Sequence, residues 1–337
     1  MFNQYYRSMN RENWQGRIDS RENFLAFRWH QWIRELDLRK DHASQKNRTG
    51  FAFLGFKSDE GIRRNKGRPG ASKGPDSIRR ELANLPCYFS EEVQLFDAGD
   101  MLCENGNLKE SQQHLSEAVT RLLKLNLFPI VLGGGHEIAL GHYRGIRNML
   151  DQQQPESRIG IFNLDAHFDL RPYPNGGSSG TMFRQIADEN TEQKRPFSYF
   201  CAGVQRHSNT IELFRTAQEL GVQYLLAKDM ARGDHWQIIE KVDCFVSQND
   251  SIYLTICSDV FSTAFAPGVS AAQPLGVDPE LVLEMLKRII STGKVISFDI
   301  AEVSPRFDQD HITASLAKVI IFTVVNTLCS YKNQLND

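Results

Sequence analysis

The sequence predicts an α/β fold in three layers, with a mostly parallel central sheet of about eight strands between two layers of helices. Short apolar runs rich in β-branched and aromatic residues alternate with segments of helical period, such as 109–126, 278–291 and 313–331. This alternation indicates parallel strands joined by helical crossovers. The predicted strands are FAFLGF from residue 51, VQLFDAG from 93, FPIVLGG from 128, RIGIFNLDA from 158, FSYFCAG from 197, VQYLLA from 222, SIYLTIC from 251 and KVISFDI from 294.

We expect one large domain with an N-terminal extension. Residues 51–337 contain all the predicted strands, and α/β folds of this length are often a single domain. Residues 1–50 are polar but include Trp14, Trp29 and Trp32. This pattern favours helical segments that pack on the core over a disordered tail.

The chain contains 39 Lys and Arg and 41 Asp and Glu, which gives a net charge of -2. This near-neutral charge gives no reason to expect nucleic acid or an anionic membrane as a partner. The polar start and the short apolar run 319–325 predict a protein that is neither exported nor inserted in a membrane. Six cysteines without a CxxC pair fit a reducing cytoplasm.

Three potential metal ligands occupy alternate positions of the motif NLDAHFD, which follows the predicted strand RIGIFNL. In an extended chain Asp165, His167 and Asp169 project to one side, whereas Ala166 and Phe168 point to the other. A helix would turn the residue at i+2 away, so the spacing suits a strand end. The simpler alternative is a polar loop in solvent.

Two other predicted strands end in similar residues. FPIVL runs into GGGHE with His136, and SIYLTIC ends at Cys257 with Asp259 two residues later. Ligands of α/β sheets bind outside the carboxyl ends of the strands, so the three ends should meet. His136, Asp165, His167, Asp169, Cys257 and Asp259 are enough for two metal ions that share a bridging ligand.

These motifs resemble those of the arginase, agmatinase and formiminoglutamase superfamily, the ureohydrolases. The resemblance covers roughly residues 50–330 and includes SFDIAEVSP from residue 297, similar to the family's D-x-x-E-V-x-P. It implies an arginase-like fold and two Mn²⁺ ions. It also implies that Asp169 holds the proton of the attacking water and passes one to the leaving amine, while Glu302 faces the amidinium nitrogens of the substrate.

Several segments are similar to the formiminoglutamase branch of this superfamily. This resemblance implies hydrolysis of N-formimino-L-glutamate to L-glutamate and formamide, the last hydrolytic step of histidine degradation. The planar cationic formimino carbon of that substrate is chemically close to a guanidinium carbon. The segments are GIRRNKGR from residue 61, GGGHE from 133, SNT from 208 and APGVS from 266.

The implied substrate carries two carboxylates, so arginines are expected in its binding site. The basic segment 63–80 offers Arg63, Arg64 and Arg68 as the main candidates, although such clusters are often only solvated surface. Ser179 and Thr181, in the loop GGSSGTMF, are further candidates. Asn209 is either a substrate contact or the N-cap of the helix that follows FSYFCAG.

Two positions depart from the family pattern. Ser179 stands where arginases and agmatinases carry a histidine, which argues against arginine or agmatine as substrate. Cys257 replaces the first aspartate of the D-x-D pair, a ligand that bridges both metals in the family. Because a thiolate is a soft ligand, other divalent ions are compatible with this site.

The alternatives are a ureohydrolase for another guanidino acid, of the guanidinobutyrate or agmatine type, and a non-catalytic homologue with an impaired metal site. The resemblance also implies a homo-oligomer.

Overall fold

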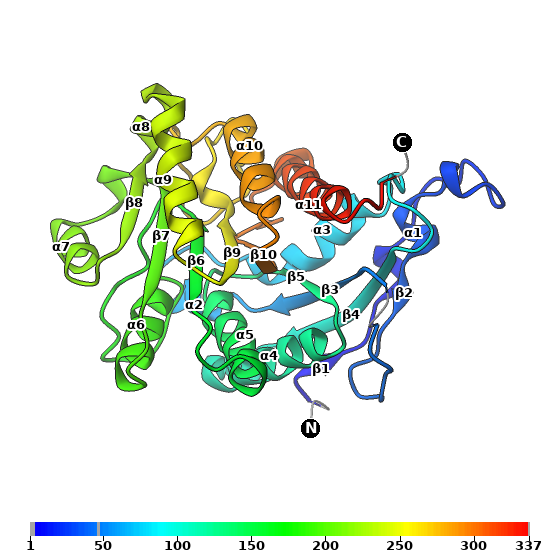
Figure 1. The fold of residues 1–337 in the computed structure, drawn as a ribbon, viewed down its shortest axis with the longest axis horizontal. Coiled ribbons are helices and arrows are strands. Elements are labelled where there is room, and N and C mark those ends of the chain that lie inside the picture. The colour runs from blue at the N-terminus through cyan, green and yellow to red at the C-terminus, as the bar shows by residue number, and fades with distance from the viewer. Residues whose placement is uncertain (1–3, 46–47, 336–337) are drawn as a thin grey trace.

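The computed structural model describes residues 4–45 and 48–335, and within them it contains a ten-stranded sheet with helices on both faces (Figure 1). The strand order is β1-β4-β3-β5-β10-β9-β6-β7-β8, with β2 also paired to β4. Only β1 runs antiparallel to its neighbour. The predicted mostly parallel, helix-covered sheet is therefore confirmed. All eight predicted runs form strands, and β1 and β2 are added at the β4 side.

The strands follow the predicted apolar runs closely, because almost every residue in them is buried between the two helical layers. Their bounds are β1 Tyr6–Arg7, β2 Arg34–Glu35, β3 Gly50–Lys57, β4 Gln94–Leu102, β5 Phe128–Leu132, β6 Ile159–Leu164, β7 Ser198–Val204, β8 Gln223–Leu226, β9 Ser251–Cys257 and β10 Val295–Ala301.

Helices α4 and α5 cover one face of the sheet, while α3, α9, α10 and α11 cover the other (Figure 1). Each layer encloses its own apolar cluster against the sheet. The helix bounds are α1 Trp29–Trp32, α2 Glu60–Arg64, α3 Gly74–Leu82, α4 Leu108–Lys124, α5 Ile138–Gln153, α6 Met182–Glu192, α7 Ile211–Glu219, α8 Ala227–Arg232, α9 His235–Ser247, α10 Pro279–Ile290 and α11 Ile312–Tyr331.

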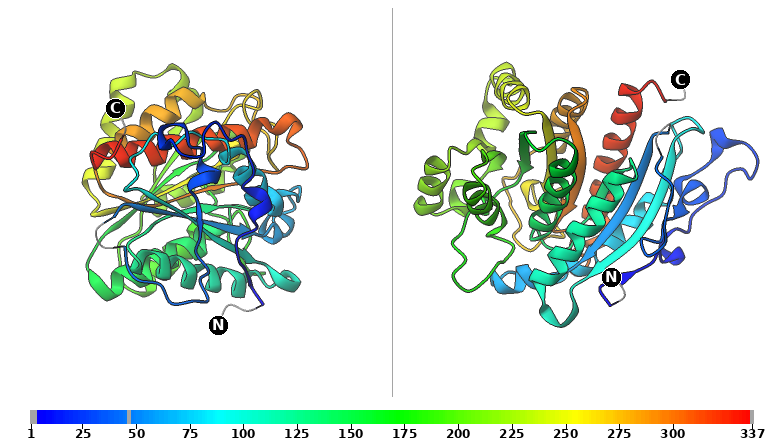
Figure 2. Two further views of the ribbon diagram at one scale, coloured as in Figure 1. Left: turned by 90° about the vertical axis from the view of Figure 1, so that its right-hand side faces the viewer. Right: turned by 60° about the horizontal axis from the view of Figure 1, so that its bottom comes forward.

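The N-terminal extension packs on the core, but the expectation that it is helical is wrong for most of its described part. It contains two-residue strands, short 3-10 turns and the four-residue helix α1. Asn10 and Asn23 cap those turns with their own side chains, which favours tight turns over longer helices. The extension lies along the β4 side of the sheet (Figure 2) and thereby covers an edge strand.

Two tryptophans anchor this extension. The Trp14 indole donates to the Asp97 carboxylate at 2.6 Å, and the Trp29 side chain is fully buried against Phe53. Asp97 is in turn paired with the buried guanidinium of Arg79 at 2.9 Å. The extension is therefore fixed by burial and by a buried charge pair, rather than by helix propensity.

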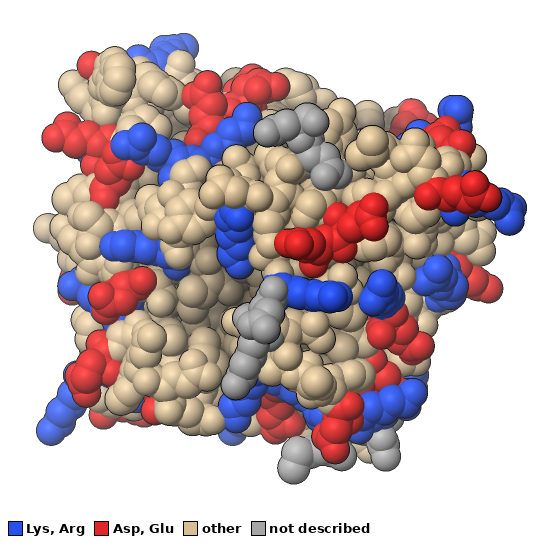
Figure 3. All heavy atoms as spheres, turned by 45° about the vertical axis from the view of Figure 1, so that its right-hand side comes forward, with Lys and Arg blue, Asp and Glu red and all other residues tan. Residues whose placement is uncertain are grey.

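Helix α11 with the turn before it, residues 309–331, is the one helix among the described residues that is long and apolar enough to cross a membrane. Its most apolar window has a mean hydropathy of 1.8, and 56% of that window is buried. The helix packs against α3 and α10, so its apolar character is explained by core packing. On the face drawn in Figure 3, acidic and basic side chains are interspersed.

Candidate metal centre and active site

The four central strands, in the order β5-β10-β9-β6, all point their carboxyl ends to the same edge of the sheet. Their register aligns Ile300 with Leu132, Ala301 with Cys257 and Leu164 with Ile256. The residues that follow these strands must therefore meet. They include His136 after β5, Asp165, His167 and Asp169 after β6, Cys257 and Asp259 at the end of β9, and Glu302 after β10.

Asp165 stands between two histidines. Its Oδ2 lies 2.9 Å from His136 Nδ1, and its Oδ1 lies 3.4 Å from His167 Nδ1. The same nitrogen of His136 is 3.1 Å from Asp169 Oδ2, and that of His167 is 3.2 Å from Asp259 Oδ2. The Asp165 carboxylate thus joins two clusters, a first one with His136 and Asp169 and a second one with His167 and Asp259. A ligand that bridges two metal ions would be placed in this way.

Cys257 belongs to the first of these clusters. Single ligand atoms of His136, Asp165 and Cys257 lie within 4.8 Å of one another, and the same holds for Asp165, His167 and Asp259. Burial and the charges of Asp165 and Asp259 raise the pKa of the Cys257 thiol well above its usual value. The thiol therefore stays protonated unless a cation binds beside it.

Neighbouring carboxylates raise the pKa of both histidines. Burial lowers the pKa of His136, but its hydrogen bonds to Asp165 and Asp169 outweigh burial and raise the pKa well above the usual value. His167 behaves in the same way beside Asp259 and Asp165. Burial and the charge of Asp165 raise the pKa of Asp169 to about 6. Such proton-bridged His and Asp pairs are the groups that release protons when metal binds.

Two oxygens at the site are buried and lack a partner in the described part of the chain: Asp259 Oδ1 and Glu302 Oε2. A buried acceptor without a partner is costly, so each calls for a cation or a donor that the chain does not supply. Together with two His, three Asp and one Cys in contact, these oxygens show that the residues fit a pair of divalent metal ions. The other oxygen of Glu302 accepts from the His136 backbone N–H at 3.2 Å.

Both candidate catalytic acids have a left-handed backbone, with φ of 50° at Asp169 and 68° at Glu302. This conformation costs a side chain other than glycine about 1–3 kcal/mol and often marks functional sites. Nearby, a Cβ on Gly134 would lie 1.7 Å from the Ser58 carbonyl oxygen, which explains the glycines before His136.

A cavity of about 300 Å³ opens over this cluster. Arg68 and Ser179, both candidates from the sequence, line it. The lining residues are Ile62, Asn65, Lys66, Gly67, Arg68, His136, His167, Asp169, Arg171, Ser179, Cys257, Asp259, Ser270, Ala271 and Glu302. Five of the six candidate metal ligands, Glu302 and several basic side chains thus line one cavity, whereas Asp165 does not line it.

Arg63 and Arg64 are not among the lining residues. Both guanidinium groups pair with Glu60, at 2.5 Å for Arg63 and 2.8 Å for Arg64. Arg64 also donates to the carbonyl oxygens of Gly106 and Gly177. The i, i+3 and i, i+4 spacing on α2 makes Glu60 the nearest partner, a contact that the sequence interpretation did not weigh.

Thr181 and Asn209 also lie outside the cavity and support the loops around it. Thr181 Oγ1 accepts from the Ser178 N–H at 2.8 Å, within the serine-glycine loop. Asn209 accepts from the Phe168 N–H at 3.1 Å and donates to the Ala166 carbonyl at 2.9 Å. Asn209 is not the helix N-cap, because Thr210 caps α7.

The sequence interpretation missed Arg171, which lines the cavity from the loop after β6. In the described chain its guanidinium group has neither a hydrogen bond nor an ion pair, whereas the Arg68 guanidinium donates to the carbonyls of Val269 and Ser270. A signal was present, because Arg171 continues the alternate spacing of Asp165, His167 and Asp169.

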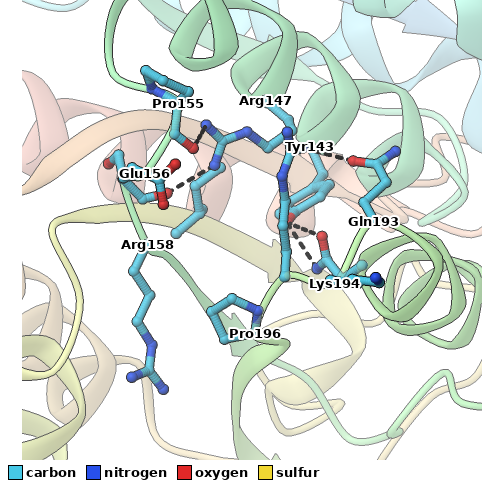
Figure 4. A pocket seen from close by; sticks show the side chains of 12 residues that line it. Tyr143, Arg147, Pro155, Glu156, Arg158, Gln193, Lys194 and Pro196 are labelled. Atoms are coloured by element: carbon cyan, nitrogen blue, oxygen red, sulfur yellow. Dashed lines mark hydrogen bonds between the residues drawn. The ribbon is translucent and has the colours of Figure 1, made fainter.

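A second cavity of about 300 Å³ lies near the amino end of β6 and is drawn in Figure 4. The guanidinium of Arg147 in this cavity already donates hydrogen bonds to the carbonyl oxygens of Ser157 and Pro155. The side chain of Arg158 points away from the other labelled side chains (Figure 4). Neither group of potential metal ligands lines this cavity, so the cavity over the strand ends is the candidate active site.

A family model described as the arginase family matches residues 49–326. The chain belongs to the arginase family. It is 59% identical over 325 residues to a formimidoylglutamase of Clostridium tetani, covering 96% of each chain. It is 45% identical over 312 residues to a formimidoylglutamase of Geobacillus sp. strain WCH70, covering 93% of each.

Solved structures of the family have the same fold. The formimidoylglutamase of Bacillus subtilis superimposes with a TM-score of 0.73 at 24% identity, covering 83% of this chain and 87% of that one. The formiminoglutamase of Trypanosoma cruzi with Mn²⁺ superimposes with a TM-score of 0.72 at 23% identity, covering 85% and 95%. The arginase-like arrangement implied by the sequence motifs is therefore confirmed for this chain.

Proposed function

We propose that this chain is a metal-dependent hydrolase that converts N-formimino-L-glutamate and water to L-glutamate and formamide, the last hydrolytic step of histidine degradation. The observation that carries the proposal is the buried Glu302, whose partnerless oxygen belongs to the cavity that five of the six potential metal ligands line, all except Asp165. An amidinium N–H supplies the donor and the positive charge that this oxygen lacks. The high identity to formimidoylglutamases supports this choice of substrate.

The six-residue set would hold two metal ions, for which we propose Mn²⁺; Asp165 is common to both groups of potential ligands. Metal ions held in this way lower the pKa of a coordinated water and supply positive charge near neutral pH. The manganese-containing formiminoglutamase of Trypanosoma cruzi supports the choice of metal. We propose that Cys257 ligates as a thiolate, and its softness makes other divalent ions compatible with the site.

The side chains of the chain supply orientation and proton transfer. Glu302 pairs with the amidinium nitrogens and holds the formimino carbon over the ligand cluster. Water adds its oxygen to that carbon, and the bond from the carbon to the glutamate nitrogen then breaks. Asp169 Oδ2 accepts the proton that the water loses and returns one to the glutamate nitrogen, so formamide keeps the imino nitrogen.

Recognition of the substrate carboxylates is assigned to Arg171, together with Lys66, which also lines the cavity. Arg171 offers a guanidinium fork without a partner, and such forks bind carboxylates in a bidentate manner. Arg68 holds the segment with Val269 and Ser270 at the rim. Ser179 lines the same wall. Arg171→Gln should raise KM about 10- to 100-fold, since a charge-assisted hydrogen bond contributes about 1.5–3 kcal/mol.

Arg63→Lys is the matched control for Arg171→Lys. Arg63 pairs with Glu60 and lies outside the cavity, so its KM should not change. Arg171→Lys keeps the charge but loses the fork, so its KM should rise. Equal KM values for the two lysine variants would remove Arg171 from substrate recognition.

Product analysis tests the proposed activity. The manganese-loaded protein is given N-formimino-L-glutamate, 4-guanidinobutyrate, agmatine and arginine, and formamide and urea are measured separately. Formamide from the first compound, with little urea from the others, is expected. Urea release as the main activity would instead identify a hydrolase of guanidino compounds, and no release from any compound would indicate a non-catalytic homologue.

We further propose that the protein acts in the cytoplasm as a homo-oligomer. All six cysteines are free, which supports a reducing compartment. The homo-oligomer follows from the family resemblance. Sedimentation velocity of the purified protein tests it, because a monomer at working concentration would contradict it.

A further inference from the structure

Asp299, in the β10 motif SFDIAEVSP, has no part in the proposed chemistry, yet it is fully buried. It pairs in register with Thr255 on β9. Thr255 Oγ1 donates to Asp299 Oδ1 at 2.6 Å, and the same Oγ1 lies 3.0 Å from His136 Nε2. A continuous chain of hydrogen bonds therefore links Asp299 to a candidate metal ligand.

Asp299 acts as an acceptor in this chain. Its Oδ2 accepts from the Tyr253 hydroxyl and lies 2.5 Å from His142 Nδ1. With these donors and Thr255 around it, the carboxylate receives three hydrogen bonds in a fully buried setting. His142 is fixed at its other nitrogen by Ser297.

The single hydroxyl proton of Thr255 decides which atom donates in the hydrogen bond between Thr255 and His136. A threonine hydroxyl has one proton and two acceptor positions. Because Asp299 takes that proton, the oxygen of Thr255 has only lone pairs to offer His136. The bond therefore requires a proton on His136 Nε2, and this leaves Nδ1, which faces Asp165 and Asp169, as the nitrogen that can bind metal.

We propose that Thr255 and Asp299 are positioning residues that hold the proton of His136 on Nε2 and so keep Nδ1 available as a metal ligand. This inference rests on the proposed metal site. Partners of this kind, bonded to the far nitrogen of a ligating histidine, typically change metal affinity about 10- to 100-fold when removed. The two ions should respond differently, because His136 belongs to one cluster and His167 to the other.

The experiment is a titration of metal-free protein with Mn²⁺, with free Mn²⁺ followed by electron paramagnetic resonance. Thr255→Val removes the hydroxyl at nearly unchanged volume, and Thr255→Ser restores it. The valine variant should bind one of the two ions about 10- to 100-fold more weakly, and the serine variant should bind both as the wild type does. Thr191→Val, on α6 and remote from the cluster, controls for a threonine-to-valine change.

Wild-type Mn²⁺ affinity in Thr255→Val, or an equal loss of affinity in Thr255→Ser, would contradict the positioning role of Thr255. Neither result would contradict the proposed metal site. Failure of the wild type to bind metal would instead contradict the proposed function. If the valine variant does not fold, the position of the His136 proton is measured directly in the wild-type protein. After loading with Zn²⁺, ¹⁵N-histidine resonances should place the His136 proton on Nε2, with the signal assigned by its loss in His136→Asn. A proton on Nδ1 would overturn the proposal.

Discussion

Replacing Asn209 by alanine should destabilise the protein although this side chain touches neither substrate nor metal. Asn209 is 8% exposed and makes three hydrogen bonds. Its Oδ1 accepts from the Phe168 N–H at 3.1 Å, and its Nδ2 donates to the carbonyls of Ala166 at 2.9 Å and Gln205 at 2.8 Å. Two of these bonds hold the backbone positions that alternate with the ligands of the loop after β6.

The expected magnitude follows from these bonds. A typical hydrogen bond contributes about 1 kcal/mol, so losing three of them should lower the free energy of unfolding of Asn209→Ala by about 3 kcal/mol. The loop that carries Asp165, His167 and Asp169 also becomes less ordered, so metal affinity should fall as well. Measuring stability in metal-free protein separates the two effects.

The assay is urea denaturation of the metal-free protein, followed by circular dichroism. Asn209→Asp keeps one acceptor but turns a charged oxygen toward two carbonyls, so it should destabilise at least as much as alanine. Asn326→Ala is the control, because in the described chain that amide has one hydrogen bond, to the Phe322 carbonyl within α11, so the loss should be about 1 kcal/mol, a third of that in Asn209→Ala. A loss below about 1 kcal/mol in Asn209→Ala would refute the bracing role.

Three further results are expected. Cys257→Ala should lose at least one ion by mass-spectrometric metal analysis, whereas Cys257→Asp should keep two and favour manganese over softer ions; two ions and full turnover in the alanine variant would mean that the thiol only packs. Glu302→Gln should lower kcat/KM about 10- to 100-fold with unchanged metal content, and loss of metal would sink the assignment. Gly61→Ala places a Cβ 2.4 Å from the Glu137 carboxyl, so urea denaturation should report a loss of about 1–3 kcal/mol; unchanged stability would contradict this packing.

The sheet and the ligand cluster could be predicted from the sequence because both depend on local patterns. Apolar runs marked the strands, and alternate spacing placed Asp165, His167 and Asp169 on one face. Parallel strands bring their carboxyl ends to one edge, which makes the convergence with His136 and Asp259 a consequence of topology.

The surroundings of the cluster could not be predicted, because they depend on which distant groups compete for each side chain. Arg63 and Arg64 form ion pairs with Glu60 instead of lining the cavity, and Asn209 hydrogen-bonds to the loop backbone. The prediction of a helical N-terminal extension was wrong for a related reason. Burial of its tryptophans and pairing of its strands with β4 outweighed the local helix propensity. Arg171 was overlooked although it continued the pattern already recognised.

The most direct test of the account is one titration of metal-free protein with Mn²⁺ in which bound metal and formamide release from N-formimino-L-glutamate are measured in the same samples. Two clusters joined through Asp165 predict two bound ions per chain. Formamide release should be absent without metal and should reach its maximum only as the second ion binds. Full formamide release from metal-free protein, or a plateau at one ion per chain with full activity, would contradict the account.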